Sequence, residues 1–477
     1  MLVALLALTA CESPCMDGFG RDDEGNCQLL ATNTDRQPTD DTDVVVETGQ
    51  DTGDPPGWPM DAGDPLEVTA TSHHMMWEFL DAEVLDEERG LVVGQGGFGI
   101  VNLADSTFAF EKNTERGYRL AVDGERAFVA TRQGRVYSID LSTDPPTSSQ
   151  SKNVGGGEWN EDIAADGGLV MLAALDAGTF LMDSNFSLLG TIPGDFAYGV
   201  GLSGDRALVA DGDVLTLYDV SNPASPSALD SVALRGTGRD IDFDGENVAV
   251  ALGARGVSLF EVVEDALVVR GDLAMPGSAS GVDLDGDWLW VGAWDVMALA
   301  WIGPGGPVVV GHETFGGAAM GIGAKDGIAL VPAWQDLPIV RRTGRVAGPE
   351  VHPPRIINLI DSAATVSLRN WGAHDLEVNL EAQGFELSES TFTLAPGDGK
   401  QVELSTSFGG QGTLVVKTND ADEASVNVPV QSGSGSLGSA HPDFSLPSFT
   451  WPGGTEGVTS LSDYEGQPVF IAYWAIY

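Results

Sequence analysis

Short apolar strands separated by tight turns set the pattern of this chain, and the clearest unit lies between residues 207 and 226. Residues 207–210 form a compact apolar run, Asp211-Gly212-Asp213 is a turn, and residues 214–220 alternate like a half-buried strand. Asn222-Pro223 ends that strand, because proline has no N–H to donate to a sheet. The unit therefore predicts two adjacent strands of an antiparallel sheet.

The same unit recurs along most of the chain, with an Asp-Gly or Ser-Gly turn before a short apolar strand. Two degenerate copies, at Asp86-Glu87 and Lys325-Asp326, flank five clear ones with turn glycines Gly124, Gly167, Gly204, Gly245 and Gly286. A repeat of about 40 residues with several strands in each copy is typical of propeller blades. The seven copies predict a mainly β chain with a seven-bladed β-propeller over residues 67–352.

One copy carries a family resemblance. Residues 215–226, LTLYDVSNPASP, resemble an LVIVD repeat; the match is fair at residues 136–142 and poor at residues 257–263. The family forms β-propellers in bacterial and archaeal surface proteins. The resemblance implies an extracytoplasmic scaffold and no shared catalytic residue.

Residues 353–433 change character after Pro353-Pro354. Alternating runs such as LEVNLEA and KQVELSTSF are separated by turns at Asn370-Trp371-Gly372 and Pro396-Gly397-Asp398-Gly399. About six or seven short strands in about 80 residues are typical of a β-sandwich. The order of the NWG, FTLAPGDGK and GTLVVKTND segments resembles bacterial Ig-like modules of the ASH and DUF1573 type, which implies a spacer or adhesion unit.

After a Gly/Ser linker at residues 434–440, residues 441–477 carry two motifs in order. HPDFSLP contains Pro442, Asp443 and Phe444, and LSDYEGQPVFIAYWA contains Leu461, Ser462, Tyr464, Gly466, Pro468 and Trp474. The apolar run at its end predicts a buried strand. The two motifs resemble the opening of thioredoxin-like redoxins of the TlpA-like and AhpC/TSA families. The resemblance implies an α/β domain and activity as a thiol-disulfide oxidoreductase or thiol peroxidase.

In those families the catalytic cysteine follows this strand almost at once, at a helix N-terminus that lowers the thiol pKa. The chain stops at Tyr477, before that position, so we interpret residues 441–477 as the start of a truncated domain. The alternative is a natural C-terminal strand that merely resembles a redoxin. We expect no catalytic residue and no thiol-dependent activity within residues 1–477, and the choice between reductase and peroxidase stays open.

The first ten residues, MLVALLALTA, are apolar and too short to span a bilayer as a mature helix. Small residues before a cleavage point predict a signal peptide over residues 1–10. Leu8-Thr9-Ala10-Cys11 resembles the bacterial lipobox, which implies lipidation of Cys11. The run lacks the usual Lys or Arg, and a cytosolic start with a chance cysteine is the alternative. Glu12, where aspartate would retain a lipoprotein in the inner membrane, favours the outer membrane of a bacterial envelope.

Two cysteines remain in a turn-rich loop over residues 11–30. An exported chain can hold a disulfide between Cys15 and Cys27. Two thiols without a nearby histidine fall short of a zinc set. Residues 31–66 are rich in Thr, Asp, Gly and Pro and predict an acidic, extended linker that tethers the propeller.

The formal net charge of the 477 residues is −48. Nucleic acids and anionic membrane surfaces attract basic patches, so we expect neither as a direct partner. The expected bilayer contact is the lipid on Cys11 alone. We expect a protein or surface ligand on the propeller, and the sequence does not identify it. Solubility in a salty medium explains the charge more simply than calcium bridging.

No cofactor or metal site is predicted. Asp240, Asp242 and Asp244 begin like a calcium loop, but the twelfth position is Ala251, where the motif needs glutamate, so the Asp-Gly turn is the better explanation. Asp283, Asp285 and Asp287 repeat this pattern.

His73 and His74 point to opposite faces of a strand, and the other four histidines are scattered. We interpret Trp288, Trp290, Trp294 and Trp301 as sheet packing, with a sugar-binding ledge as the alternative.

Overall fold

The computed structural model describes residues 19–21, 27–29, 64–74, 78–113, 116–154, 159–303, 306–344, 348–354, 357–359, 363–406, 411–421, 423–432, 445–450 and 455–460. Over these residues the secondary structure is entirely β, with no helix, and so none that could cross a membrane. The chain divides into two compact units. One comprises Met1–Pro56 and Arg119–Val282, and the other Gly57–Tyr118 and Asp283–Tyr477.

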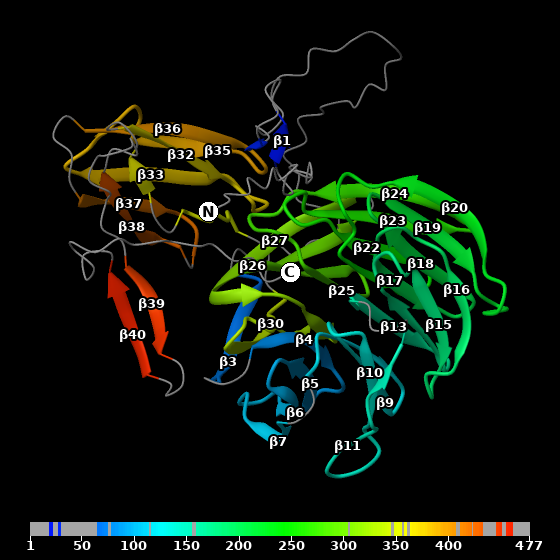
Figure 1. The fold of residues 1–477 in the computed structure, drawn as a ribbon. Coiled ribbons are helices and arrows are strands. Elements are labelled where there is room, and N and C mark those ends of the chain that lie inside the picture. Colours follow the sequence, from blue (N-terminus) through cyan, green and yellow to red (C-terminus); the bar gives the residue numbers. More distant parts are fainter. Residues whose placement is uncertain are drawn as a thin grey trace, which may run out of the picture. The chain divides into compact units, whose positions relative to one another are not determined.

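The first unit contains a series of antiparallel sheets in which neighbouring strands follow one another in sequence. Figure 1 shows them fanned side by side, with β16, β20 and β24 on the outer side. Their strands are β8 (Arg119–Asp123), β9 (Arg126–Thr131), β10 (Arg135–Asp140), β11 (Thr147–Ser148) and β12 (Lys152–Asn153); β13 (Asp162–Asp166), β14 (Leu169–Ala173), β15 (Thr179–Asp183) and β16 (Leu188–Ile192); β17 (Ala197–Ser203), β18 (Arg206–Asp211), β19 (Val214–Asp219) and β20 (Ser227–Ala233); and β21 (Asp240–Phe243), β22 (Asn247–Ala251), β23 (Val257–Val263) and β24 (Ala266–Leu273).

Burial changes from strand to strand across each of these sheets. In β14 and β15 nearly every residue is buried, whereas Leu188 and Leu189 of the last strand, β16, are 60% and 42% exposed. Between consecutive sheets, Met171 and Leu181 pack with Val200 in one buried cluster. Each such side chain contributes about 1.5–3 kcal/mol by leaving water. Stacking of sheet on sheet therefore provides the core.

The second unit contains further sheets of the same kind. Their strands are β4 (Phe79–Val84), β5 (Arg89–Gly94), β6 (Gly97–Asn102) and β7 (Phe108–Lys112); β25 (Gly281–Asp285), β26 (Trp288–Gly303) and β27 (Gly306–Ala319); and β28 (Gly323–Lys325), β29 (Ile328–Leu330), β30 (Asp336–Arg342) and β3 (Leu66–His73). The last sheet combines distant parts of the chain, because β3 pairs antiparallel with β30, with Val68 opposite Val340.

The glycines at residues 94–99, which could suggest a phosphate loop, instead form the hairpin between β5 and β6. Gly97 has a φ of 149°, and a Cβ atom there would lie 1.9 Å from the carbonyl oxygen of Lys112. Close approach of β7 therefore requires glycine at this position.

Aspartates at the ends of first strands connect each sheet to the next. Asp123 Oδ2 accepts the N–H of Gly168 at 2.7 Å, and Asp166 Oδ2 accepts that of Gly204 at 2.6 Å. In the second unit Asp285 accepts two turn N–H groups, Asp326 at 3.0 Å and Gly327 at 2.7 Å. We call Asp123, Asp166 and Asp285 the turn staples. They give acceptors to turn N–H groups that their own hairpins leave without one.

Two more sheets follow the repeats and share a separate core. One has the order β31 (Ile357–Leu359), β38 (Ser425–Ser432), β37 (Gln411–Thr418), β33 (Leu376–Gln383) and β35 (Thr391–Leu394); the other has β32 (Ala363–Arg369), β36 (Gly399–Ser405) and β34 (Glu386–Leu387). Val366 and Leu404 of the second sheet pack with Leu380 and Val416 of the first. The alternation predicted for this region is confirmed in β33, whose residues are buried and exposed in turn.

Outside these regions the described residues form two hairpins. β1 (Phe19–Arg21) pairs with β2 (Cys27–Leu29), and β39 (Ser445–Thr450) pairs with β40 (Thr455–Ser460).

We predict that Asp285→Ala lowers the free energy of unfolding by about 1–3 kcal/mol, because the N–H groups of Asp326 and Gly327 lose their acceptor. Asp287→Ala is the matched control, since Asp287 is exposed in the turn just after β25. Urea denaturation of both variants measures the effect. Equal stability of the two variants would contradict the role of the turn staple.

Candidate functional site

Charged side chains gather where the first strands of the first unit begin. Arg119, Asp162 and Asp240 each open a first strand (β8, β13 and β21) and occupy the same register position, opposite Ala130, Ala173 and Ala251. Arg119 and Asp162 are each only 4% exposed. With Glu161, which precedes Asp162, we call Arg119, Asp162 and Asp240 the strand-start cluster.

Backbone groups hold the two aspartates in place. Asp162 Oδ1 accepts the N–H of Ile163 and its Oδ2 accepts the N–H of Val200, both at 2.8 Å. Asp240 Oδ2 accepts the N–H of Val282, also at 2.8 Å. Arg119 Nη2 donates to the carbonyl oxygen of Ser280 at 2.9 Å. The bonds from Val200 to Asp162 and from Val282 to Asp240 join successive strand starts, as the turn staples join successive turns. The Arg119 bond instead joins β8 to the residue before β25.

The electrostatics of the cluster follow from this burial. Loss of water raises the pKa of Asp162 well above its ordinary value, and the nearby Asp240 carboxylate raises it further, while Arg119 opposes both effects. Burial also raises the pKa of Asp240, against the opposing charge of Arg119. The two carboxylates compete for one guanidinium in a site with little water.

Glu161 extends the cluster toward the surface. Burial raises the pKa of Glu161, while Arg132 and a hydrogen bond with the side chain of Tyr198 oppose that rise. Arg132 Nη2 lies 3.5 Å from Glu161 Oε2, and the Arg239 guanidinium lies 5.9 Å from the centre of the Tyr198 ring.

Exposed aromatic side chains border this charged region. Trp159 is 56% exposed, and the Arg132 guanidinium lies 5.6 Å from its ring centre. Phe196 is 45% exposed and its ring packs against Tyr198 at 5.9 Å. The carboxylate of Asp211 accepts the backbone N–H groups of Asp195 and Phe196, which fixes this loop. We call Trp159, Phe196, Tyr198 and Arg132 the strand-start face.

The parts of this region suit different roles. The oxygens of Asp162 and Asp240 accept backbone N–H groups, so these carboxylates stabilise the stack of sheets. The strand-start face presents the rings of Trp159 and Phe196 to solvent, and Tyr198 and Arg132 pack beneath them with side chains that are mostly buried. Such side chains dominate the energetics of protein–protein binding.

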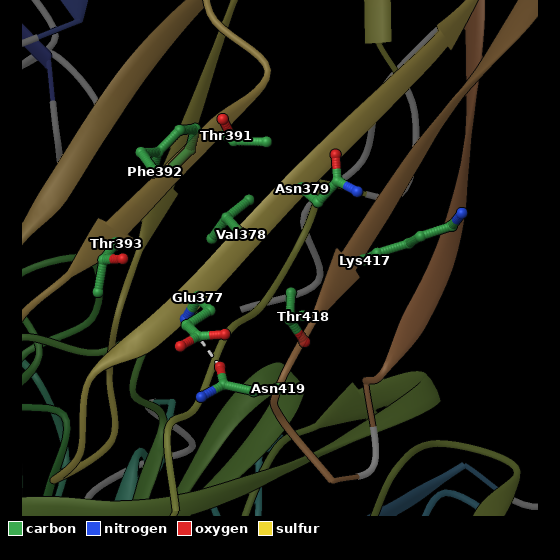
Figure 2. Close-up of a pocket in the computed structure, with 9 residues that line it drawn as sticks. All are labelled: Glu377, Val378, Asn379, Thr391, Phe392, Thr393, Lys417, Thr418 and Asn419. Atoms are coloured by element: carbon green, nitrogen blue, oxygen red, sulfur yellow. Dashed lines mark hydrogen bonds between the residues drawn. The ribbon is translucent and has the colours of Figure 1, made fainter.

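The described surface of the C-terminal sheets differs from the strand-start face. Figure 2 shows a shallow hollow over β33, β35 and β37, lined by residues such as Glu377, Asn379, Thr391 and Lys417. The N–H of Glu377 donates to Asn419 Oδ1 at 2.7 Å. The hollow has a mixed lining that includes Val378 and Phe392, and Phe392 is only partly exposed, unlike Trp159 and Phe196.

Most of the chemistry expected from sequence falls on residues outside the described ranges. This applies to Cys11, Cys15, Pro442, Asp443, Phe444, Leu461, Ser462, Tyr464, Gly466, Pro468 and Trp474. Cys27 begins β2, whose backbone pairs with β1. Lipidation, the disulfide and the redoxin domain therefore stay predictions.

The residues of the calcium-loop pattern belong to a strand and to the turn that follows it. Asp240 serves the strand-start cluster, and Asp244 Oδ1 accepts the N–H groups of Glu246 and Asn247 within its own turn. One repeat later, Asp283 Oδ2 accepts the N–H of Ala324 at 2.7 Å. The sequence did not indicate this connection between sheets.

Histidine and tryptophan positions are also described. His73 Nδ1 lies 2.8 Å from Asp336 Oδ1, whereas His74 Nε2 lies 3.8 Å from Glu111 Oε1, so the two neighbours face different carboxylates. Trp290 is fully buried, and Trp288 and Trp301 pack against the same core, as the packing interpretation expects.

The spacing of charged residues before the turn glycines is a sequence signal for the strand-start cluster. Arg119, Asp162 and Asp240 each stand five residues before a turn glycine, Gly124, Gly167 and Gly245 respectively. When the repeats are aligned on those glycines, Arg119, Asp162 and Asp240 occupy the same position. The alignment does not show that these side chains are buried.

Comparison with known proteins adds one family match. Residues 193–233, which include β17–β20, match the family model described as LVIVD repeat, so the resemblance noted in this copy is confirmed. None of the curated proteins matches the chain.

Solved structures of low sequence identity also match. "Structure of U3-55K" is 11% identical with a TM-score of 0.48, over 58% of this chain and 100% of that one. The WD40 β-propeller domain of Doa1 is 12% identical with a TM-score of 0.48, over 60% and 100%. The computationally designed Ika8 protein is 9% identical with a TM-score of 0.47, over 59% and 100%. Among the described residues, the matched LVIVD repeat lies in an array of mostly four-stranded antiparallel sheets.

We predict that the stability contributed by Asp162 falls as pH rises. Its pKa is raised above the ordinary 3.8 in the folded chain, so the folded state keeps this proton to higher pH than the unfolded state does. The contribution is complete below 3.8 and is lost as pH rises through the folded pKa. Asp162→Asn cannot ionise, so the free energy of unfolding of this variant should rise relative to that of the wild type as pH increases above about 4.

Urea denaturation at a series of pH values measures this difference. Asp176→Asn is the control for loss of an acidic side chain, because Asp176 is exposed in the turn between β14 and β15. Parallel curves for wild type and Asp162→Asn would show that the Asp162 carboxyl does not titrate differently on folding.

Proposed function

We propose that this chain is an exported binding scaffold that recruits a protein partner through its strand-start face. The observation that carries the proposal is the pair of exposed rings, Trp159 and Phe196, held beside buried charges. Tryptophan, tyrosine and arginine are the side chains most enriched among binding hot spots. Two backbone hydrogen bonds to Asp211 hold the loop that carries Phe196, which reduces the conformational entropy lost on binding.

The architecture we propose is a closed seven-bladed propeller followed by an Ig-like sandwich. The pairing of β3 with β30 supports closure, since an N-terminal strand completes the sheet of the last repeat. Two sheets around one core support the sandwich. In this arrangement the propeller binds and the sandwich spaces it from whatever follows.

The C-terminal resemblance extends the proposal. Residues 441–477 resemble a redoxin opening, so the scaffold would serve a thioredoxin-like domain with thiol-disulfide oxidoreductase or thiol peroxidase activity. A non-catalytic cell-surface binding or adhesion scaffold is the alternative. The strand-start face fits either, because recruitment of a partner needs no thiol.

We predict that a photo-crosslinking amino acid at Trp159 captures a protein partner in the native cell envelope. The same amino acid at Leu188 is the matched control, since Leu188 is a similarly exposed apolar residue, 60% exposed on the outer strand β16. Electrophoresis after irradiation should show a discrete adduct for position 159 alone. Equal adducts at both positions, or none at position 159, would contradict recruitment by this face.

Membrane anchoring is proposed from Leu8-Thr9-Ala10-Cys11, which resembles a lipobox. We predict that the expressed protein partitions with membranes and incorporates labelled palmitate. Cys11→Ser should abolish both, because the thiol is the site of lipidation, and Cys15→Ser should abolish neither. Equal labelling of the Cys11→Ser variant would end the anchor proposal.

A further inference from the structure

A buried group of histidine and glutamate side chains lies in the second unit, between β27 and the loops of the C-terminal sheets. His312 is on β27, Glu350 is in the segment that leads to β31, and Glu423 follows β37. One potential ligand atom from each lies within 4.8 Å of the other two. No sequence motif indicated this group, because its members are far apart along the chain.

Local hydrogen bonds fix the backbone around each glutamate. The N–H of Glu350 donates to Asn370 Oδ1 at 3.3 Å, and its carbonyl oxygen accepts the N–H of Trp371 at 2.8 Å. The carbonyl oxygen of Glu423 accepts the Thr418 hydroxyl at 2.9 Å. The carboxylates are therefore presented from ordered segments.

Burial makes it unfavourable for the side chains of His312 and Glu350 to carry charge. The His312 side chain is 0% exposed and that of Glu350 is 5% exposed, with His312 Nδ1 2.6 Å from Glu350 Oε1. His312 Nε2 is buried and has no hydrogen-bond partner among the described residues. Buried polar groups are normally hydrogen-bonded or bound to a metal, so the unpartnered Nε2 of a fully buried histidine beside two carboxylates points to a missing ligand.

We propose that His312, Glu350 and Glu423 bind a divalent metal ion, for which Zn²⁺ is the best candidate. Imidazole nitrogen and carboxylate oxygen are both zinc ligands, at about 2.0–2.2 Å from the ion. Small side-chain movements would bring donors that lie within 4.8 Å of one another to such distances. His352, whose ring centre is 5.4 Å from that of His312, would be the fourth ligand.

The ion would have a structural role. It would join the β26–β27 hairpin to the segment before β31 and to the connection between β37 and β38. The sheet of β25–β27 and the C-terminal sheets would then be coupled through one centre. The inference is independent of partner binding at the strand-start face, since it uses different residues.

The test uses the full chain, stripped with EDTA and then titrated with ZnCl₂ in high salt, which suppresses loose binding to the acidic surface. We expect one tightly held zinc per chain by elemental analysis, and a rise in the thermal unfolding temperature on zinc addition. With Co²⁺ in place of Zn²⁺, visible absorption bands should report the ligand geometry.

His312→Gln and Glu423→Gln are the informative variants, and His73→Gln is the control at an exposed histidine. Each informative variant should weaken zinc binding by more than the roughly 10–100-fold that loss of a second-shell partner costs. Cys15→Ser/Cys27→Ser, which removes competing thiols, should keep the site. Without metal, Glu423→Gln should unfold at the same or a higher temperature than the wild type, because it removes one buried charge.

Absence of a stoichiometric zinc in the wild type would overturn the proposal, as would unchanged affinity in both informative variants. A metal-free Glu423→Gln chain that is less stable than the wild type would also count against it. That result would make the group a hydrogen-bonded His–Glu cluster, sufficient without an ion.

Discussion

Hydrogen bonds from the backbone of one sheet to an aspartate of the sheet before it are the interaction on which the repeated architecture depends. Asp123, Asp166 and Asp285 bind turn N–H groups of the following hairpin, and Asp162 does the same for a strand N–H. A hairpin turn leaves such N–H groups without an acceptor. Each sheet is therefore completed by its neighbour, in addition to packing on it.

This arrangement explains why so acidic a chain can place aspartate inside its sheets, where aspartate is usually unfavourable. The cost of burying Asp162 and Asp240 is offset by two kinds of partner, backbone N–H groups and the Arg119 guanidinium. Because the offset is incomplete, the pKa of each aspartate is raised. The same rigid base lets Trp159 and Phe196 remain exposed in fixed positions, which is the physical argument for binding there.

The C-terminal sheets follow other rules. Their strands alternate between buried and exposed residues, and one core lies between the two sheets. In the second unit, the His312–Glu350–Glu423 group brings ionisable side chains from the repeats and from these sheets close together. A cation bound there would neutralise these carboxylates and link the segments that carry them.

The sequence by itself determined the local elements. Alternation predicted strands such as β33, and the turn glycines marked the hairpins, because side-chain periodicity and positive φ are properties of a few neighbouring residues. The resemblance at residues 193–233 likewise depended on one contiguous repeat. The motif residues of the redoxin prediction, together with Cys11 and Cys15, lie outside the described residues, whereas Cys27 begins β2.

Tertiary structure alone decided which residues meet. The pairing of β3 with β30, the link from Asp283 to Ala324, and the approach of His312 to Glu350 join residues far apart in sequence. The column of charges before the turn glycines was visible in the sequence, but its burial was not. Local patterns say which face of a strand is apolar, whereas the partners of a buried polar group are set by how whole sheets stack.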